Sequence, residues 1–197
     1  MFGSPIYTYN ELKTYIDSQN QYEYKYWITL TWDIETQLKM KAAVCKRLNI
    51  TTDAEELHNI QKIEDELEQW KVNQARRWFI DIAKINKSHL YPWWGTNTED
   101  ANWHFHAVIL SEKRLYKGKS LSKWQQCKPV GKDWHVYNPM KGAIPYIYRG
   151  HYAVINQKGA FCPALAKSCR RGRCKHQQID FIRDFRQWAK EQEVNAA

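Results

Sequence analysis

The sequence lacks an uninterrupted apolar run of the roughly 18 residues that a membrane-spanning helix needs, and mean hydropathy is −0.75. Its first residues also lack the charged-then-apolar profile of a signal peptide. We therefore expect a cytoplasmic protein with no membrane partner. The five cysteines are an odd number, which in a chain without a secretion signal argues against a disulfide framework. We find no internal repeat and no low-complexity linker, so the 197 residues favour one domain with an extension.

Basic residues are in excess. Lys and Arg number 30 against 21 Asp and Glu, a formal net charge of +9, which makes a polyanion, nucleic acid first, the expected partner. Ten Trp and twelve Tyr accompany this charge. Cations that follow phosphates and rings that stack on bases are what a single-strand binder uses, although we assign most of the aromatic residues to the core.

The charge is distributed unevenly along the chain. Residues 53–68 hold seven acids against Lys62, whereas residues 113–149 hold nine bases against Asp133. The second segment is the expected electrostatic footprint on DNA, and its named contacts are Lys113, Arg114, Lys117, Lys119 and Lys123. Trp124 and Trp134 lie in it as stacking or, in preference, core residues.

Hydrophobic periodicity predicts an α+β fold. We expect helices at 10–18 with Asn10 as N-cap, at 53–84 with Thr52 as N-cap and at 179–191, and strands at 22–32, 90–94, 103–110 and 134–137. Strands that follow one another closely favour an antiparallel sheet over alternating βαβ units. The expected architecture is a central antiparallel sheet of about five strands, with the helices mainly on one face.

The segment 102–110, NWHFHAVIL, is the most informative. Residues two apart on a strand point to the same face, so His104 and His106 project together, about 6–7 Å apart along the strand. The opposite face, which includes Phe105 and Ala107, is uniformly apolar and should pack under the long helix. Two imidazoles at this separation can converge on one divalent ion.

Two further blocks stand beside this one. WITLTW at 27–32 lies upstream, and GAIPYIYRG at 142–150 lies downstream. In this order and spacing the three blocks resemble the motifs of HUH endonucleases that initiate rolling-circle replication: a TLT strand, a histidine-hydrophobic-histidine pair and a YxxK tyrosine motif. The resemblance covers residues 27–149 and implies the HUH, RRM-like palm as the fold.

The resemblance also implies a site. His104 and His106 would be metal ligands, and a tyrosine would attack a DNA phosphodiester to leave a 5′-phosphotyrosine and a free 3′-hydroxyl. Tyr146 is the best match to YxxK and Tyr148 is the second choice. Arg149 takes the place of the motif's lysine, which argues against a role that needs a neutral amine.

Two histidines leave such a metal short of ligands. The family usually adds a third polar ligand, for which we nominate Glu99, with the adjacent Asp100 and His89 as alternatives. An oxygen and imidazole site suits Mn²⁺ or Mg²⁺, and the histidines favour Mn²⁺.

Residues 161–197 form a basic, cysteine-rich extension to an endonuclease domain at 1–160. A zinc site is one interpretation of four residues in this extension, Cys162, Cys169, Cys174 and His176, although their spacing lacks the C-x2-C knuckle. The preferred alternative is that the cysteines are reduced and bind no metal. Arg170, Arg171 and Arg173 are in either case expected to contact DNA phosphates.

The sequence therefore predicts a metal-dependent endonuclease that nicks and rejoins single-stranded or stem-loop origin DNA. No phosphate-loop motif is present, so a separate helicase and the host replication machinery would be needed. The alternatives are an HUH transposase or relaxase with the same chemistry, and a non-catalytic module that binds single-stranded nucleic acid.

Overall fold

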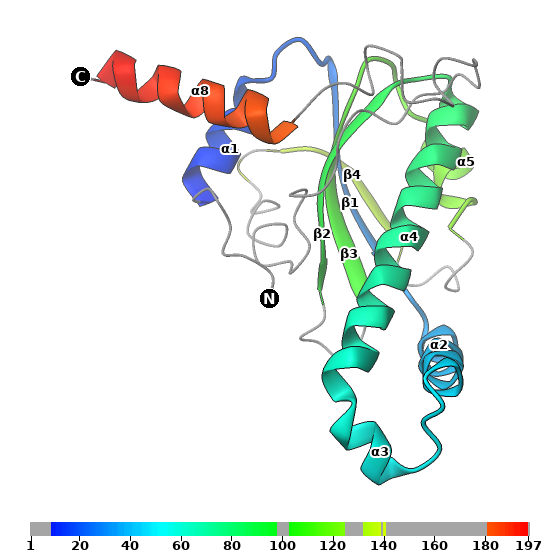
Figure 1. The fold of residues 1–197 in the computed structure, drawn as a ribbon. Helices are drawn as coiled ribbons and strands as arrows, with labels where there is room; N and C mark the ends of the chain where they lie inside the picture. The colour runs from blue at the N-terminus through cyan, green and yellow to red at the C-terminus, as the bar shows by residue number, and fades with distance from the viewer. Residues whose placement is uncertain (1–8, 98–102, 125–131, 139, 141–180, 197) are drawn as a thin grey trace, which may run out of the picture.

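The structure, a computed structural model, describes residues 9–97, 103–124, 132–138, 140 and 181–196 (Figure 1). Its elements in chain order are α1 (Tyr9–Ser18), β1 (Tyr24–Thr31), α2 (Ile34–Arg47), α3 (Asp53–His58), α4 (Ile60–Asn86), β2 (Leu90–Asn97), β3 (His104–Ser111), α5 (Lys117–Leu121), β4 (Lys132–Val136) and α8 (Phe181–Ala196). No helix within these ranges is both long and apolar enough to cross a membrane.

The strands form one antiparallel sheet in the order β2-β3-β1-β4, with β3 and β1 in the centre. The α+β class and the antiparallel sheet are confirmed. The described residues supply four strands where we expected about five. β2 runs on to Asn97, three residues beyond the end of the strand expected at 90–94.

The long helix α4 covers one face of the sheet. Its Phe79 ring lies 5.7 Å from that of Trp94 and 5.8 Å from that of Phe105, between ring centroids. Phe105, Ala107 and Ile109 are fully buried on this side, as their alternation predicts. Trp124 and Trp134, exposed by 2% and 5%, belong to the same core, so the preferred core assignment of both is confirmed.

The opposite face is also partly covered, by α1 and α8. Tyr15 of α1 and Phe185 of α8 lie 5.4 Å and 6.2 Å from Trp93, edge-on, and 5.2 Å from each other. The expectation of helices mainly on one face is wrong for these two elements. Each helix is amphipathic and must bury its apolar stripe. Because α4 already covers one face of the sheet, these two helices pack on the other face.

The helix expected at 53–84 is interrupted at Asn59. Thr52 is the N-cap, and it forms a reciprocal capping box with Glu55. α3 then ends at His58, and the Asn59 amide donates to Glu55 O at 2.8 Å, a local bond that competes with helix continuation. Asn10 lies inside α1 instead of capping it.

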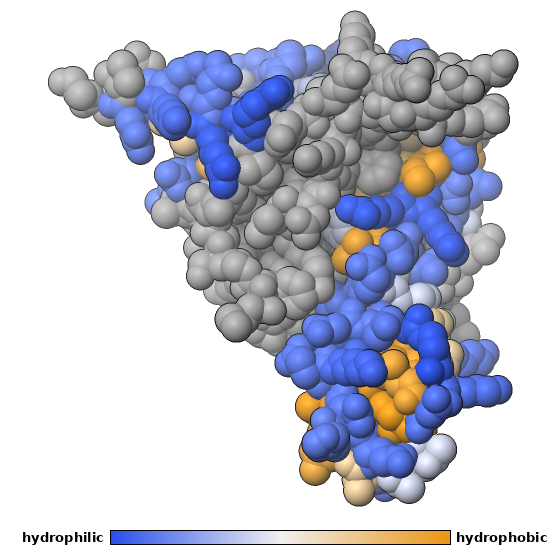
Figure 2. Space-filling model, in the orientation of Figure 1, coloured by the Kyte–Doolittle hydropathy of each residue, from blue (hydrophilic) through white to orange (hydrophobic). Residues whose placement is uncertain are grey.

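Sequence periodicity missed α2. Its signal is the N-cap Asp33, whose carboxylate accepts from Thr36 N at 2.7 Å. α2 packs on the first half of α4 through a second small core formed by Val44, Ile50, Ile63 and Leu67. Its cations also pair with the acidic segment, Lys41 with Glu56 and Arg47 with Glu66. Apolar side chains gather at this end of the molecule, where Ile34, Leu38 and Leu57 are exposed (Figure 2).

A buried ion pair joins α4 to the sheet. Glu68 and Lys71, exposed by 6% and 2%, bond to each other, and Thr96 of β2 donates to Glu68 Oε2 at 3.0 Å. The Lys71 ammonium also lies 4.5 Å over the Trp103 ring, next to His104. Burial lowers the pKa of Lys71, while Glu68 opposes that shift.

We predict that Lys71→Met destabilises the fold by about 3–5 kcal/mol, because it leaves the buried Glu68 carboxylate without a cation. Adding Glu68→Gln should recover much of this loss, since the amide oxygen still accepts from Thr96. Urea unfolding measures both variants. Lys39→Met, which breaks an exposed pair with Glu35, is the control and should cost less than about 1 kcal/mol. Equal costs at the two lysines would contradict the prediction.

Candidate functional site

The TLT strand and the histidine strand lie side by side. β1 pairs with β3 in a register that sets Thr29 opposite His106 and Thr31 opposite His104. Cross-strand partners project to the same face, so these four residues share the face of the sheet that α4 does not cover. Segments far apart in the sequence thus build one polar surface, which we call the histidine face: Trp27, Thr29, Thr31, His104, His106, Asp133 and His135.

His104 and His106 are close enough to act on one ion. Their ring centroids lie 4.6 Å apart with the ring planes at 78°. Since a metal–nitrogen bond to imidazole is about 2.1 Å long, both rings can reach a single ion between them. His104 is half-buried and His106 is 6% exposed. The expected side of the sheet is confirmed, but His106 is more enclosed than an outward-facing residue would be.

Two residues of β1 fix the His106 ring. Thr29 Oγ1 lies 2.8 Å from His106 Nδ1, in hydrogen-bond contact. Trp27 stacks on the imidazole, with ring centroids 5.1 Å apart and planes only 8° from parallel. The contact at Nδ1 leaves Nε2 as the nitrogen for a metal, which is the way a metal-ligating histidine is usually oriented. Burial, and secondarily the neighbouring His104, lower the pKa of His106 to about 3.

β4 adds a carboxylate and a third imidazole to the histidine face. Asp133 lies opposite Thr29 and His135 opposite Trp27, and Asp133 Oδ1 is 2.6 Å from His135 Nε2. Both side chains are exposed. Neighbouring strands are about 4.8 Å apart, so Asp133 stands two strands from His106. From the sequence we noted Asp133 only as an isolated acid in a basic segment. Its spacing of two residues from His135 on one strand could have indicated that both side chains share one face.

The described side chains supply no third ligand of the kind expected beside His104 and His106. No group of three or more His, Cys, Asp or Glu within the described ranges is arranged to hold a metal ion. Glu99 and Asp100 lie outside those ranges. Asn97, the last described residue of β2, is set opposite His104 by the register.

His89 lies at the other end of the sheet. It precedes Leu90, which pairs with Ser111, whereas Asn97 pairs with His104. At the usual rise per residue, the length of β3 separates the two ends by about 23 Å, so His89 cannot share an ion with His104.

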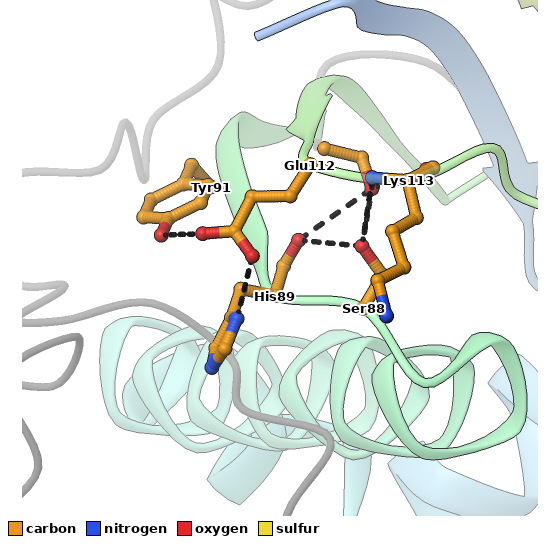
Figure 3. A network of polar contacts seen from close by, with 6 residues as sticks. Ser88, His89, Tyr91, Glu112 and Lys113 are labelled. Carbon is orange, nitrogen blue, oxygen red and sulfur yellow. Dashed lines mark hydrogen bonds and ion pairs between the residues drawn. The ribbon is translucent and has the colours of Figure 1, made fainter. Parts of the chain in front are cut away.

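His89 instead belongs to a polar network (Figure 3). Its Nδ1 lies 2.7 Å from Glu112 Oε2, and Tyr91 OH donates to Glu112 Oε1 at 2.9 Å. Ser88 Oγ and Ser111 Oγ are 2.9 Å apart, and Lys113 N donates to Ser88 Oγ. Burial, followed by the bond to Glu112, raises the pKa of Tyr91. These contacts tie the start of β2 to the end of β3.

The described cations at 113–119 lie away from the histidines. Lys113 and Arg114 follow the Ser111 end of β3, and α5 with Lys117 and Lys119 packs on α4, on the opposite face of the sheet. Trp78 Nε1 donates to Ser120 O at 3.1 Å, which fixes α5 on that side. The structure therefore brings together the TLT and histidine blocks, and it separates them from Lys113, Arg114, Lys117 and Lys119.

The remaining site residues named from the sequence lie outside the described residues. They are the tyrosine motif with Tyr146, Tyr148 and Arg149, the zinc candidates Cys162, Cys169, Cys174 and His176, and the cations Arg170, Arg171 and Arg173. No protein-family model, curated protein or solved structure matches the chain.

The low pKa of His106 predicts a pH effect on stability in the metal-free protein. The unfolded chain binds a proton at this imidazole below pH 6.5, and the folded chain only near pH 3. The free energy of unfolding therefore falls as the pH drops through this window, by up to about 1.4 kcal/mol per pH unit.

Urea unfolding in EDTA between pH 7 and pH 4 measures this slope. We expect His106→Asn to flatten the slope by about this amount. The control His58→Asn, at an exposed position at the end of α3, should keep the wild-type slope. If wild type and His106→Asn lose stability in parallel, the buried neutral imidazole is ruled out.

Proposed function

We propose that the protein is a metal-dependent endonuclease of the HUH type that nicks and rejoins single-stranded or stem-loop DNA to initiate rolling-circle replication. The observation that carries the proposal is the pairing of Thr29 with His106 and of Thr31 with His104. Two sequence blocks that resemble separate motifs of one enzyme family become neighbours on one face of a central sheet. If the two blocks occurred in the sequence by chance, nothing would require their strands to pair in this register.

The chemistry of the ligands supports a divalent ion at His104 and His106. The buried His106 imidazole is neutral at physiological pH, and a neutral ring is the form that binds metals. Two imidazoles favour Mn²⁺ over Mg²⁺, and Glu99 is the proposed oxygen ligand. Such an ion, when bound, would act as a Lewis acid toward a DNA phosphate.

The proposed reaction exchanges one ester for another. The Tyr146 hydroxyl oxygen forms a bond to phosphorus, the bond from phosphorus to the 3′-oxygen breaks, and the phenolic proton ends on that oxygen. The products are a 5′-phosphotyrosine and a 3′-hydroxyl that can prime synthesis. Because the ester is retained on the protein, the reverse reaction reseals the strand without ATP. A separate helicase and host replication proteins would complete replication.

A covalent adduct is the direct test. Wild-type protein incubated with Mn²⁺ and a 5′- and 3′-labelled single-stranded stem-loop should give a protein–DNA band on a denaturing gel that keeps only the label on the 3′ side of the nick. We expect Tyr146→Phe to abolish the band, because it removes the attacking oxygen, and Tyr148→Phe to retain it.

The opposite pattern would move the nucleophile to Tyr148. Loss of the band in His104→Ala, with binding of the DNA retained, separates catalysis from binding. Absence of an adduct over a randomised stem-loop library, with binding present, would overturn the proposal in favour of a non-catalytic single-strand binder. Adduct formation specific to mobile-element ends would favour the transposase or relaxase alternative.

Thr29 gives a second prediction, as a positioning residue that acts through His106. Thr29→Val keeps the β-branched shape but removes the hydroxyl 2.8 Å from His106 Nδ1. We expect Mn²⁺ to bind about 10–100-fold more weakly, the usual loss when the partner of a metal-bound histidine is removed. Electron paramagnetic resonance of free Mn²⁺ measures the affinity.

Thr31→Val is the matched control. Thr31 lies on the same strand and face, opposite His104, and it is also half-buried. It should keep wild-type affinity, and Thr29→Ser should restore most of it. Equal weakening in the two valine variants, or no rescue by serine, would assign Thr29 a general structural role.

A further inference from the structure

Exposed cations gather on two neighbouring segments on the side of the molecule away from the histidines. Along α4 the exposed positions recur at helical spacing, Arg77, Ile80, Lys84 and Lys87, so the three cations lie on one stripe. The neighbouring segment adds more exposed cations. We call the set the α4–α5 surface: Arg77, Lys84, Lys87, Lys113, Arg114, Lys117, Lys119 and Lys123.

Buried hydrogen bonds fix these two segments against each other. Asn86, exposed by 8%, accepts from Tyr116 N at 2.8 Å and donates to Ser120 Oγ at 3.0 Å. Lys113 N donates to Ser88 Oγ at 3.2 Å. The cations of α4 and of α5 therefore stand on one rigid scaffold, although about 30 residues separate them in the sequence.

Few acids offset this charge. Residues 73–89 and 112–124 together hold nine Lys or Arg and two acids, Asp81 and Glu112. Glu112 bonds to His89 and Tyr91 in the network of Figure 3. The position of Lys84 and Lys87 at the end of α4 is favourable for the helix dipole, but that effect does not extend to the cations at 113–123.

We propose that the α4–α5 surface binds the phosphate backbone of duplex DNA, independently of metal and of base sequence. The stripe from Arg77 to Lys87 is about 15 Å long at the helical rise. At one phosphate per 3.4 Å of axis, a stripe of this length faces about four phosphates of a strand. The three cations of the stripe can each contact one of these phosphates.

The α4–α5 surface is poorly suited to two other polyanions, single-stranded nucleic acid and an anionic membrane. Single-strand binders stack bases on exposed rings, but Trp78, Trp124 and Trp134 are buried here. Tyr116 is 58% exposed, and the Lys119 ammonium lies 5.3 Å over its ring. A helix that lies on a membrane inserts an apolar face, whereas the apolar face of α4 is packed against the sheet.

This surface and the histidine face lie on opposite sides of the sheet. Lys117 Nζ donates to Trp134 O at 3.2 Å, so α5 adjoins the edge strand β4, whose other face carries Asp133 and His135. DNA that contacts both surfaces would pass around this edge, with its duplex part on α4 and α5 and its single-stranded part at the histidines. This last arrangement rests on the proposed function; the duplex contact does not.

The test is the salt dependence of binding to a random-sequence duplex in EDTA, measured by fluorescence anisotropy from 50 to 300 mM salt. Lys84→Gln, Lys87→Asn and Lys119→Gln are combined, asparagine being chosen because Lys87 has a positive φ of 50°. We expect the slope of log affinity against log salt to fall by about 1 for each cation removed.

A matched triple variant carries the control. Lys46→Gln, Lys62→Gln and Lys190→Gln remove the same charge from exposed positions on α2, the first half of α4 and α8. The control triple should alter the slope by less than about half of the change expected for the Lys84, Lys87 and Lys119 triple. Equal effects of the two triples would overturn the proposal, because net charge alone would then account for binding. If the Lys84, Lys87 and Lys119 triple variant loses affinity for vesicles with anionic lipid while its duplex binding is unchanged, the proposal is overturned in favour of a membrane partner.

The two proposals can fail separately. The Lys84, Lys87 and Lys119 triple variant should still form the Mn²⁺-dependent adduct with a short single strand, since none of these residues lies on the histidine face. If the adduct forms but duplex binding is unaffected by the triple, the α4–α5 proposal fails alone. If salt-dependent binding responds as expected and no adduct forms with any strand, the nicking proposal fails alone.

Discussion

The antiparallel pairing of β1 with β3 is the constraint on which the rest of the structure depends. A strand has a side-chain period of two, so a slip of one residue in this register would move His106 to the core and Phe105 to the outside. The burial of Ile28, Leu30, Phe105 and Ala107 under α4 holds the register. The same register delivers Thr29 and Trp27 to His106. Packing of the core and orientation of the candidate ligand are thus set by one interaction.

The two halves of α4 have different surroundings. α4 closes the core on one face, while its first half extends past the sheet and is covered by α2. The acids of that half are partly paired with cations of α2, such as Arg47 with Glu66. The second half carries exposed cations and no comparable acidic run. A single helix therefore has one end whose acids are partly paired within the protein and one end whose exposed charges are mainly cations.

This arrangement separates two kinds of chemistry. The histidine face has an enclosed imidazole, a hydroxyl that contacts it and an indole that stacks on it, which suit fixed geometry around a small ion. The α4–α5 surface has long, hydrated side chains, which suit many weak contacts with phosphates. The sheet between them keeps the two apart, so each can be altered without the other. The tryptophans mostly pack the layers together, as the core assignment in the sequence analysis expected.

The sequence by itself determined the local features. Alternation located β1, β3 and β4, the apolar spacing located most of α4, and the HFH block singled out His104 and His106. Each depends on residues close in the chain, where period and capping act. The tertiary structure decided the break at Asn59, the packing of α1 and α8 on the second face, and the distance between His89 and His104. It also decided which cations share a surface with Lys84. Those outcomes depend on which apolar faces remain to be covered and which strands pair, and such long-range competition leaves no local pattern to read.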